Sequence, residues 1–275
     1  MNPIDSALWY VERHFERELT LEEIAAHAQV SPHYLTRAFG AVTGRSLMRY
    51  VRGRRLSLAA QRLASGAPDI LTVALEAGYG SHEAFTRAFR EQFGITPETL
   101  RAQRCTDNIE LVEAVKMQQA ITNLPRPRFV TGKPLLIAGI GERYTCESSA
   151  GIPAQWQRFL PHFGNVPHQV GNVAYGVSCN ADDEGNFDYI CGVEVTSFSD
   201  LPAEFARVRI PAQRYAVFKH ADHISTIRST MSSIFSEWLP QSGHQIADAP
   251  NFERYGEEFD GSTGYGGLEV WIPIV

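Results

Sequence analysis

The sequence lacks several features that would assign it to familiar classes of protein. Its four cysteines, Cys105, Cys146, Cys179 and Cys191, form no Cys-x-x-Cys pair, so we expect neither a zinc site nor a redox motif. No apolar run approaches the length that spans a bilayer, and the first residues show no signal-peptide pattern. We therefore expect a cytoplasmic protein with reduced thiols, no membrane association, no metal and no cofactor.

Acidic residues are also absent from one long stretch, Ile24 to Pro68, which nevertheless carries many arginines: Arg37, Arg45, Arg49, Arg52, Arg54, Arg55 and Arg62. The first 104 residues contain 13 Arg, no Lys and 11 acidic residues, so they carry a net charge of +2 within a chain whose total is −6. Arginines without interspersed acids are typical of a surface that contacts phosphates. A chain of 275 residues is long enough for two domains, and we expect the basic one first.

An internal repeat organises the first hundred residues. Leu35-Thr36-Arg37-Ala38-Phe39 recurs 50 positions later as Phe85-Thr86-Arg87-Ala88-Phe89, and Ser31 and Gly44 recur as Ser81 and Gly94. Each copy has the apolar spacing of a helix, a tight turn and a second helix. Ser31 and Ser81 are expected N-caps, and Thr20 with Glu23 forms a capping-box pattern. The repeat therefore predicts two helix-turn-helix units.

One long helix is expected between the two copies, from Ser46 to about Ser65. Eighteen residues in a helix span about 27 Å, and adjacent major-groove sites on one face of DNA lie about 34 Å apart. A rigid helix of this length is suited to hold two recognition helices in successive major grooves.

The region from about Leu19 to Arg104 resembles the DNA-binding module of the AraC/XylS family. The resemblance includes the repeat, the turn Ala77-Gly78-Tyr79 and the closing segment from Phe93 to Arg104, although most family members carry this module at the C-terminus. It implies promoter or operator DNA as a partner, with RNA polymerase as a further candidate. In each copy a Thr-Arg pair lies on the outer face of the second helix, where it can reach base edges, whereas Arg45 and Arg49 are placed to touch phosphates. The candidate DNA contacts are His33, Thr36, Arg37, Arg45, Arg49, Glu83, Thr86, Arg87 and Arg90.

The second half of the chain has a different pattern. Ile109 to Gln119 is expected to form a strand or a short helix, followed by a proline-marked hinge at Pro125 and Pro127. Beyond it, strand, helix, strand and strand patterns occur twice, with helices at Ile152–Phe163 and Thr226–Trp238. The sequence thus predicts an all-α double helix-turn-helix domain, residues 1–107, a linker, 108–126, and an α+β domain with an antiparallel sheet, 127–275.

This second half resembles the GyrI-like effector-binding domain. The segments that carry the resemblance are Trp156–Phe159, Phe187–Tyr189, Gly192–Val195, Ile210-Pro211, Phe252–Tyr255 and Glu269–Pro273. The resemblance implies a small-molecule effector, hydrophobic and often cationic, bound in a groove between two similar modules.

Residues suited to such a groove combine aromatic walls, which attract cations through their faces, with carboxylates in predicted strands. The candidates are Trp156, Tyr175, Tyr189, Glu194, Tyr215, Glu253, Tyr255, Glu269 and Trp271. Since alternate residues of a strand point to opposite faces, about half of such a set is expected to serve the core instead.

We expect a transcription regulator rather than an enzyme. Two alternatives for the second domain stay open: hydrolysis of a bound compound by a pocket glutamate and aromatics, and binding of a protein.

Overall fold

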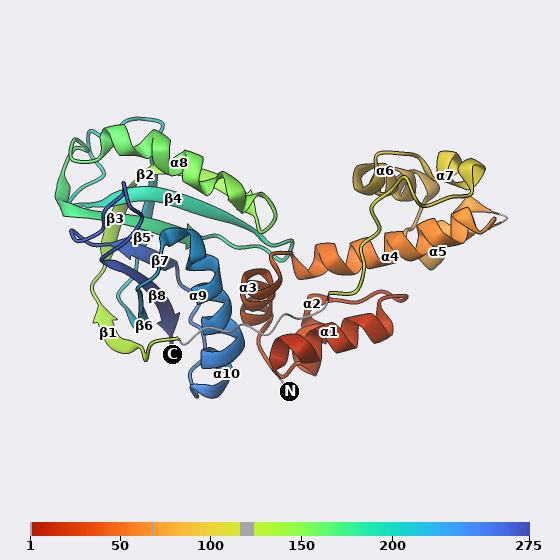
Figure 1. Ribbon diagram of the computed structural model, residues 1–275, viewed down its shortest axis with the longest axis horizontal. Helices are drawn as coiled ribbons and strands as arrows, with labels where there is room; N and C mark the ends of the chain where they lie inside the picture. The colour runs from red at the N-terminus through yellow and green to blue at the C-terminus, as the bar shows by residue number, and fades with distance from the viewer. Residues whose placement is uncertain (1, 68, 116–123) are drawn as a thin grey trace. The chain divides into compact units, whose positions relative to one another are not determined.

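The computed structural model describes residues 2–67, 69–115 and 124–275 (Figure 1). The chain forms two compact units. The first contains residues 3–35 and the described residues between 47 and 115; the second contains residues 2, 36–46 and 124–275. Residues 36–46, which include the second half of the helix at Pro32–Thr43, therefore belong to the second unit, because their contacts are mostly with the C-terminal part of the chain.

Seven helices precede the sheet in the described chain (Figure 1). They are α1 (Pro3–His14), α2 (Leu21–His27), α3 (Pro32–Thr43), α4 (Leu47–Ala64), α5 (Ile70–Glu76), α6 (His82–Phe93) and α7 (Pro97–Gln103). The two predicted helix-turn-helix units are confirmed as α2–α3 and α5–α6, and the predicted long helix between them is α4, with 18 residues. Helix α1 was not predicted.

Local capping explains where the recognition helices begin. The hydroxyl oxygens of Ser31 and Ser81 accept hydrogen bonds from the backbone N–H groups of Tyr34 and Ala84, each at 3.1 Å, which confirms both predicted N-caps. Gly44, which the repeat pairs with Gly94, follows the last residue of α3 and adopts a φ of +70°, as helix-ending glycines commonly do. At Thr20 the capping-box pattern is borne out on both sides. Thr20 Oγ1 accepts from the Glu23 N–H at 3.2 Å, and a backbone hydrogen bond from Thr20 is among the contacts that lower the pKa of Glu23, whose carboxylate also binds Tyr10.

The residues after α7 pack on the helical unit. Residues 109–115, predicted as strand or short helix, form neither, and the rest of that predicted element lies outside the described residues. The N–H of Val112 donates to Ser57 Oγ at 2.8 Å, and its carbonyl oxygen accepts from Arg54 Nη1 at 2.8 Å. Ile109 and Leu111 pack against the core of the second helix-turn-helix unit.

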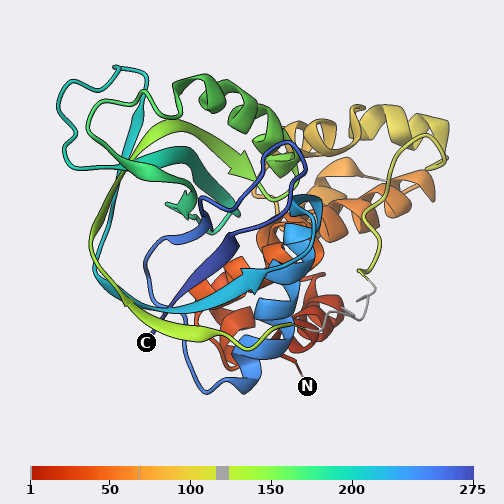
Figure 2. The ribbon, with the colours of Figure 1, turned by 60° about the vertical axis from the view of Figure 1, so that its left-hand side comes forward.

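An antiparallel sheet of eight strands forms the second unit, which confirms the predicted α+β class (Figure 2). The strands are β1 (Arg128–Gly132), β2 (Leu135–Thr145), β3 (Gln169–Cys179), β4 (Asn186–Val195), β5 (Ala206–Ile210), β6 (Gln213–His220), β7 (Asn251–Tyr255) and β8 (Leu268–Ile274). Their order across the sheet is β1-β6-β8-β7-β3-β4-β2-β5. Strand β1 was not predicted. Pro211 separates β5 from β6, which pair with different neighbours.

The sheet curls strongly (Figure 2), and two opposed glycines accompany the curl. Gly139 on β2 and Gly192 on β4 are register partners. A Cβ at Gly139 would lie 2.0 Å from the Cys191 carbonyl oxygen, and one at Gly192 would lie 2.5 Å from that of Ala138. Only residues without a side chain allow the two backbones to approach so closely.

Register partners share a face of the sheet, so one row of residues defines each face. Phe218, Val270, Glu253, Gly176, Cys191 and Ile140 are successive partners from β6 to β2. Helix α8 (Ile152–Phe159) packs on this face, since Phe159 belongs to the same core cluster as Cys191. Helix α9 (Ile227–Ser233) lies on it too, because Thr230 hydrogen-bonds His220, which points the same way as Phe218. We call this the helical face and the other the opposite face.

Helix α9 continues as one turn of π-helix, Ile234–Trp238, before α10 (Leu239–Gln241). Pro240 has no N–H to donate to the Ser236 carbonyl, as a regular helix would require. That carbonyl instead accepts from the side-chain amide of Asn2 at 2.6 Å.

Candidate functional site

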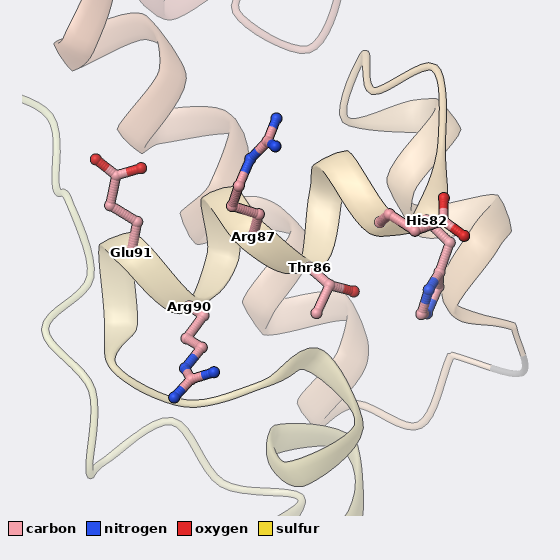
Figure 3. A pocket seen from close by; sticks show the side chains of 6 residues that line it. His82, Thr86, Arg87, Arg90 and Glu91 are labelled. Carbon is pink, nitrogen blue, oxygen red and sulfur yellow. The ribbon is translucent and has the colours of Figure 1, made fainter.

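The outer face of α6 presents the predicted contacts of the second helix-turn-helix unit. Glu83, Arg87 and Arg90 are exposed, and with His82, Thr86 and Glu91 they line a shallow surface hollow of about 620 Å³. Figure 3 shows Arg87 and Arg90 extending from the helix on either side of Thr86. His82 approaches Glu98 at 3.0 Å, at the start of α7. Two extended guanidinium groups on one exposed helical face suit the major groove of DNA.

Thr36 and Thr86, the threonines of the two Thr-Arg pairs, have buried hydroxyl oxygens without a hydrogen-bond partner within the described residues. Their hydroxyl groups therefore point away from solvent. A thymine methyl group is the base feature that an exposed threonine methyl can contact.

Helix α3 differs from α6 at the matching positions. Arg37 is only half-exposed, and its Nη1 donates to the carbonyl oxygen of Ala249 at 3.3 Å. Burial lowers the pKa of Arg37 to about 10, while the nearby Asp248 acts in the opposite direction. Gly40, one turn further along, is buried against the sulfur of Cys146. His33 is half-buried at the start of the helix.

The arginine-rich stretch divides into exposed and structural residues. Arg45 and Arg49, the predicted phosphate contacts, are exposed near the start of α4. Arg54, by contrast, pairs with Glu12 of α1 at 2.7 Å, and Arg62 pairs with Glu76 at 2.5 Å. Since α1 was not predicted, the partner of Arg54 could not be foreseen. The local charge excess therefore serves partly to hold the helices together.

A carboxylate and three aromatic residues meet on the helical face of the sheet. The hydroxyl groups of Tyr189 and Tyr255 donate to the same oxygen of Glu253, Oε2, at 2.6 and 2.8 Å. The indole Nε1 of Trp156, on α8, donates to the Tyr189 hydroxyl at 3.2 Å, and its ring packs edge-on against Tyr255 at 4.8 Å. We call these four residues the Glu253 cluster.

Glycine makes this cluster possible. Gly176 on β3 lies opposite Glu253, and a Cβ there would stand 2.0 Å from the Tyr189 hydroxyl oxygen. The tyrosine therefore crosses the backbone of β3 to reach a carboxylate two strands away. Helix α8 is anchored beside it, because the buried Gln155 amide donates to the carbonyl oxygens of Ile140 and Tyr189 at 2.8 and 2.9 Å.

Burial raises the pKa of Glu253, and the two tyrosine hydroxyls and the nearby His220 act in the opposite direction. The donors favour the charged form, since a carboxylate accepts hydrogen bonds more strongly than a neutral acid. A buried carboxyl group whose pKa is shifted by burial and by specific partners is typical of a functional site.

The structure does not bring all the predicted ligand residues together. Trp156, Tyr189, Glu253 and Tyr255 meet on the helical face, whereas Tyr175, Glu194, Tyr215, Glu269 and Trp271 belong to the opposite face. There Glu269 pairs with Arg128 at 2.6 Å and accepts from the Trp271 indole at 3.1 Å. Tyr215 and Trp271 pack with Phe252. The pairing of Glu194 and Glu269 with Trp156 and Tyr189, which the sequence suggested, is therefore absent from the arrangement described.

His220 and Gly176 are the neighbours of Glu253 that the sequence analysis did not select. His220 is buried, with Nδ1 2.9 Å from Thr230 Oγ1 and Nε2 3.1 Å from the His223 carbonyl oxygen. Strand alternation in the sequence shows that His220 and Phe218 lie on the same face of the sheet. That His220 lies near Glu253 follows only from the register of β6, β8 and β7, which the sequence does not give.

Across the described ranges, no helix is long and apolar enough to cross a membrane. In the same ranges, no group of three or more His, Cys, Asp or Glu side chains is arranged to hold a metal ion.

Comparison with known proteins agrees with this architecture. The family described as the GyrI-like small molecule binding domain matches residues 125–275, and a helix-turn-helix domain family matches residues 24–103. The chain is 26% identical over 283 residues to the right origin-binding protein of Escherichia coli K12, covering 98% of this chain and 96% of that protein.

Two further matches each cover one part of the chain. Regulatory protein SoxS of Escherichia coli K12 is 36% identical over 98 residues, which are 36% of this chain and 92% of SoxS. The solved structure of SAV2435 bound to tetraphenylphosphonium aligns with a TM-score of 0.47 at 18% identity, covering 55% of this chain and 94% of that one. The chain belongs to the GyrI-like family and is a transcriptional regulator that joins an AraC-type DNA-binding domain to a GyrI-like small-molecule-binding domain.

Proposed function

We propose that the chain is a ligand-controlled regulator in which α3 and α6 read promoter DNA and the Glu253 cluster binds a hydrophobic, cationic effector. The observation that carries the effector assignment is the half-buried carboxylate whose Oε2 accepts from two tyrosines. The other oxygen, Oε1, has no hydrogen-bond partner within the described residues and is free to face a bound cation.

The surroundings of this carboxylate support an aromatic or aliphatic cation. Tyr189, Tyr255 and Trp156 supply apolar surface, and aromatic faces attract cations through their negative quadrupole. A small inorganic cation would find too few oxygen ligands, since it prefers six or more. Fully hydrated cations would lose more solvation than one carboxylate returns.

The DNA assignment is supported by the exposed face of α6. Arg87 can contact guanine O6 and N7 with both guanidinium nitrogens, and Arg90 and the exposed Arg49 are placed for phosphates. The curated relatives are regulators as well, which favours binding over turnover in the second domain.

Calorimetric titration tests the effector site. The probes are tetraphenylphosphonium, a lipophilic cation, and triphenylphosphine oxide, a neutral compound with a similar aromatic surface. Wild type should prefer the cation, and Glu253→Gln should weaken the cation at least about tenfold, the loss of one charge-assisted contact, while changing the neutral compound little.

Glu269→Gln is the matched control, because Glu269 is a partly exposed carboxylate of the same sheet that already pairs with Arg128. This control should behave like wild type with both probes. If Glu253→Gln weakens both probes equally, the cluster contributes packing alone and the proposed charge selection is wrong.

A further inference from the structure

The two recognition helices share the segment Thr-Arg-Ala-Phe at matching positions but differ in their surroundings. Arg87 and Arg90 of α6 are exposed, whereas the matching positions of α3, Arg37 and Gly40, are half-buried and buried. Both copies share the Thr-Arg pair and the N-cap serine, so the helix sequence does not explain why Arg37 is less exposed than Arg87. Contacts that residues 36–46 make with the rest of the second unit cover Arg37 and Gly40.

Three separate segments of the second unit hold α3 and the turn after it. Ala249, in the loop before β7, accepts the hydrogen bond of Arg37. Cys146, after β2, lies against Gly40, and the neighbouring Glu147 Oε1 accepts from the Ser46 N–H at 3.3 Å. Gly185, in the β3–β4 turn, lies so close to Ser46 that a Cβ there would stand 2.6 Å from the serine Cβ.

These contacts are incompatible with reading of DNA by the same face of α3. A recognition helix must place its outer face on base edges in a groove about 12 Å wide, which a single helix fills. Arg37 and Gly40 form that face. Arg37 donates its hydrogen bond to Ala249, and Cys146 covers the surface at Gly40.

The loop that holds Arg37 leads directly into the proposed effector site. Ala249 is followed by Pro250 and then by β7, which carries Glu253 four residues after Ala249. A ligand that draws the Glu253 carboxylate from its tyrosines therefore acts on the strand whose preceding loop holds the arginine.

We propose that these contacts are autoinhibitory: residues 146–147, 185 and 248–249 sequester the first recognition helix, and effector binding at Glu253 releases it. This inference rests on the proposed function, because it assumes that α3 reads DNA and that Glu253 binds the effector. It predicts two states of the chain, of which the present structure is the one with α3 held.

A disulfide can lock the held state. A Cβ built at Gly40 lies 4.0 Å from the Cβ of Cys146, within the range of about 3.5–4.5 Å that disulfides adopt. In Gly40→Cys, diamide should therefore take two electrons and two protons from the new thiol and Cys146 and leave one S–S bond. Mass spectrometry measures this crosslink, and Gly40→Cys/Cys146→Ser, which keeps the other cysteines, is the matched control.

DNA binding of the full chain then tests the sequestration, with a duplex selected from a randomised pool by wild type. With tetraphenylphosphonium present to release α3, oxidised Gly40→Cys should bind at least about tenfold more weakly than the same protein after reduction, the loss expected when one bidentate arginine contact is withheld. The control should be unaffected by diamide. Equal affinity of the crosslinked and reduced forms, or failure of the crosslink to form, would overturn the inference. Absence of DNA binding by wild type both with and without tetraphenylphosphonium would instead contradict the proposed function.

A second variant covers the case in which Gly40→Cys does not fold. Cys146→Phe places a ring where Gly40 packs, so it should displace α3 and strengthen DNA binding relative to wild type. The control is Cys105→Phe, at an exposed cysteine. No gain with Cys146→Phe would count against autoinhibition.

The effector arm uses tetraphenylphosphonium and the rate of crosslinking in Gly40→Cys. If calorimetry shows that the compound binds, the crosslink should form several times more slowly in its presence. Binding with an unchanged rate would refute release by the effector, whereas absence of binding would contradict the proposed effector class.

Discussion

At the scale of single residues, Thr86 belongs both to the proposed DNA-contacting surface and to the core of the helical unit. Its side chain lines the hollow on α6, but its hydroxyl oxygen is buried without a partner in the part of the chain that the structure describes. A buried hydroxyl without a hydrogen bond destabilises a fold, because it gives up its bonds to water. The methyl group is then the part of Thr86 that can serve DNA recognition.

Thr86→Val should therefore stabilise the chain by about 1 kcal/mol and leave DNA affinity nearly unchanged, because valine keeps the methyl group and removes the unpaired hydroxyl. Thermal unfolding and a DNA-binding titration measure the two effects. Thr72→Val is the matched control, since Thr72 Oγ1 donates to the N-cap Asp69 at 2.7 Å. The control should lose stability. A clear loss of DNA affinity in Thr86→Val would show that the hydroxyl itself is read.

Glu253 predicts opposite trends with pH for stability and for cation binding. Because burial raises its pKa in the folded chain, the folded state holds the proton more tightly than the unfolded state does. The stability contribution of Glu253 therefore falls as pH rises from its ordinary value of 4.5 through the raised one, and the affinity for a cation rises over the same interval.

Glu253→Gln should remove both trends and raise the melting temperature at neutral pH. Relief of about 1 kcal/mol corresponds to about 2–4 °C for a domain of this size. Thermal unfolding and tetraphenylphosphonium titrations across this pH range measure the two dependences. A pH dependence of cation affinity that survives in Glu253→Gln would assign the charge selection to another group.

At the scale of elements, local signals account for what the sequence predicted well. Caps at Ser31 and Ser81 and the glycine turn at Gly44 lie within a few residues of the helices they delimit, so no distant contact is needed to recognise them. Helix α1, which was not predicted, carries a local signal of the same kind, since its buried residues Ile4, Ala7, Leu8 and Val11 have helical spacing.

Other elements depend on partners far away in the chain. Strand β1 is an edge strand that pairs only with β6, about 85 residues later, and its own alternation is weak. The π-turn of Ile234–Trp238 precedes Pro240 and is completed by Asn2. Likewise, alternation sorts residues within a strand, but only register shows that Tyr189 meets Glu253 across Gly176 while Glu194 lies on the other face.

The recognition helices give a prediction of their own. Arg87→Ala should weaken specific DNA binding by about 1–3 kcal/mol and relax base preference in one half of the site, because a bidentate contact to guanine is lost. With α3 released by the effector, Arg37→Ala should do the same in the other half. Footprinting and selection of binding sequences measure both effects, with Arg207→Ala, at an exposed arginine of β5, as a control. Unchanged affinity and preference in both variants would remove these arginines from the interface.

At the scale of the whole molecule, the helical unit extends beyond the predicted domain boundary at residue 107. Val112 bonds with Ser57 and Arg54 of α4, and the Val115 N–H donates to the Tyr50 hydroxyl at 3.1 Å. The Val112 side chain also fills the space over Gly53, where a Cβ would stand 2.8 Å from it. Residues 109–115 thus act as a strap along α4 and the second helix-turn-helix core.

A fragment of residues 1–115 should therefore be more stable than one of residues 1–107. The shorter fragment uncovers Ser57, which is 2% exposed in the full chain, and removes Ile109 and Leu111 from the core of Phe85 and Phe89. Lost burial and hydrogen bonds of this kind correspond to about 2 kcal/mol. Thermal unfolding of the two fragments compares their stability, and sedimentation with gel-shift titration gives their oligomeric state on DNA. Both fragments should bind DNA as monomers, since one chain carries two recognition helices. Equal melting temperatures would show that the strap contributes nothing to stability. Binding only as a dimer would contradict the use of both helices by one chain.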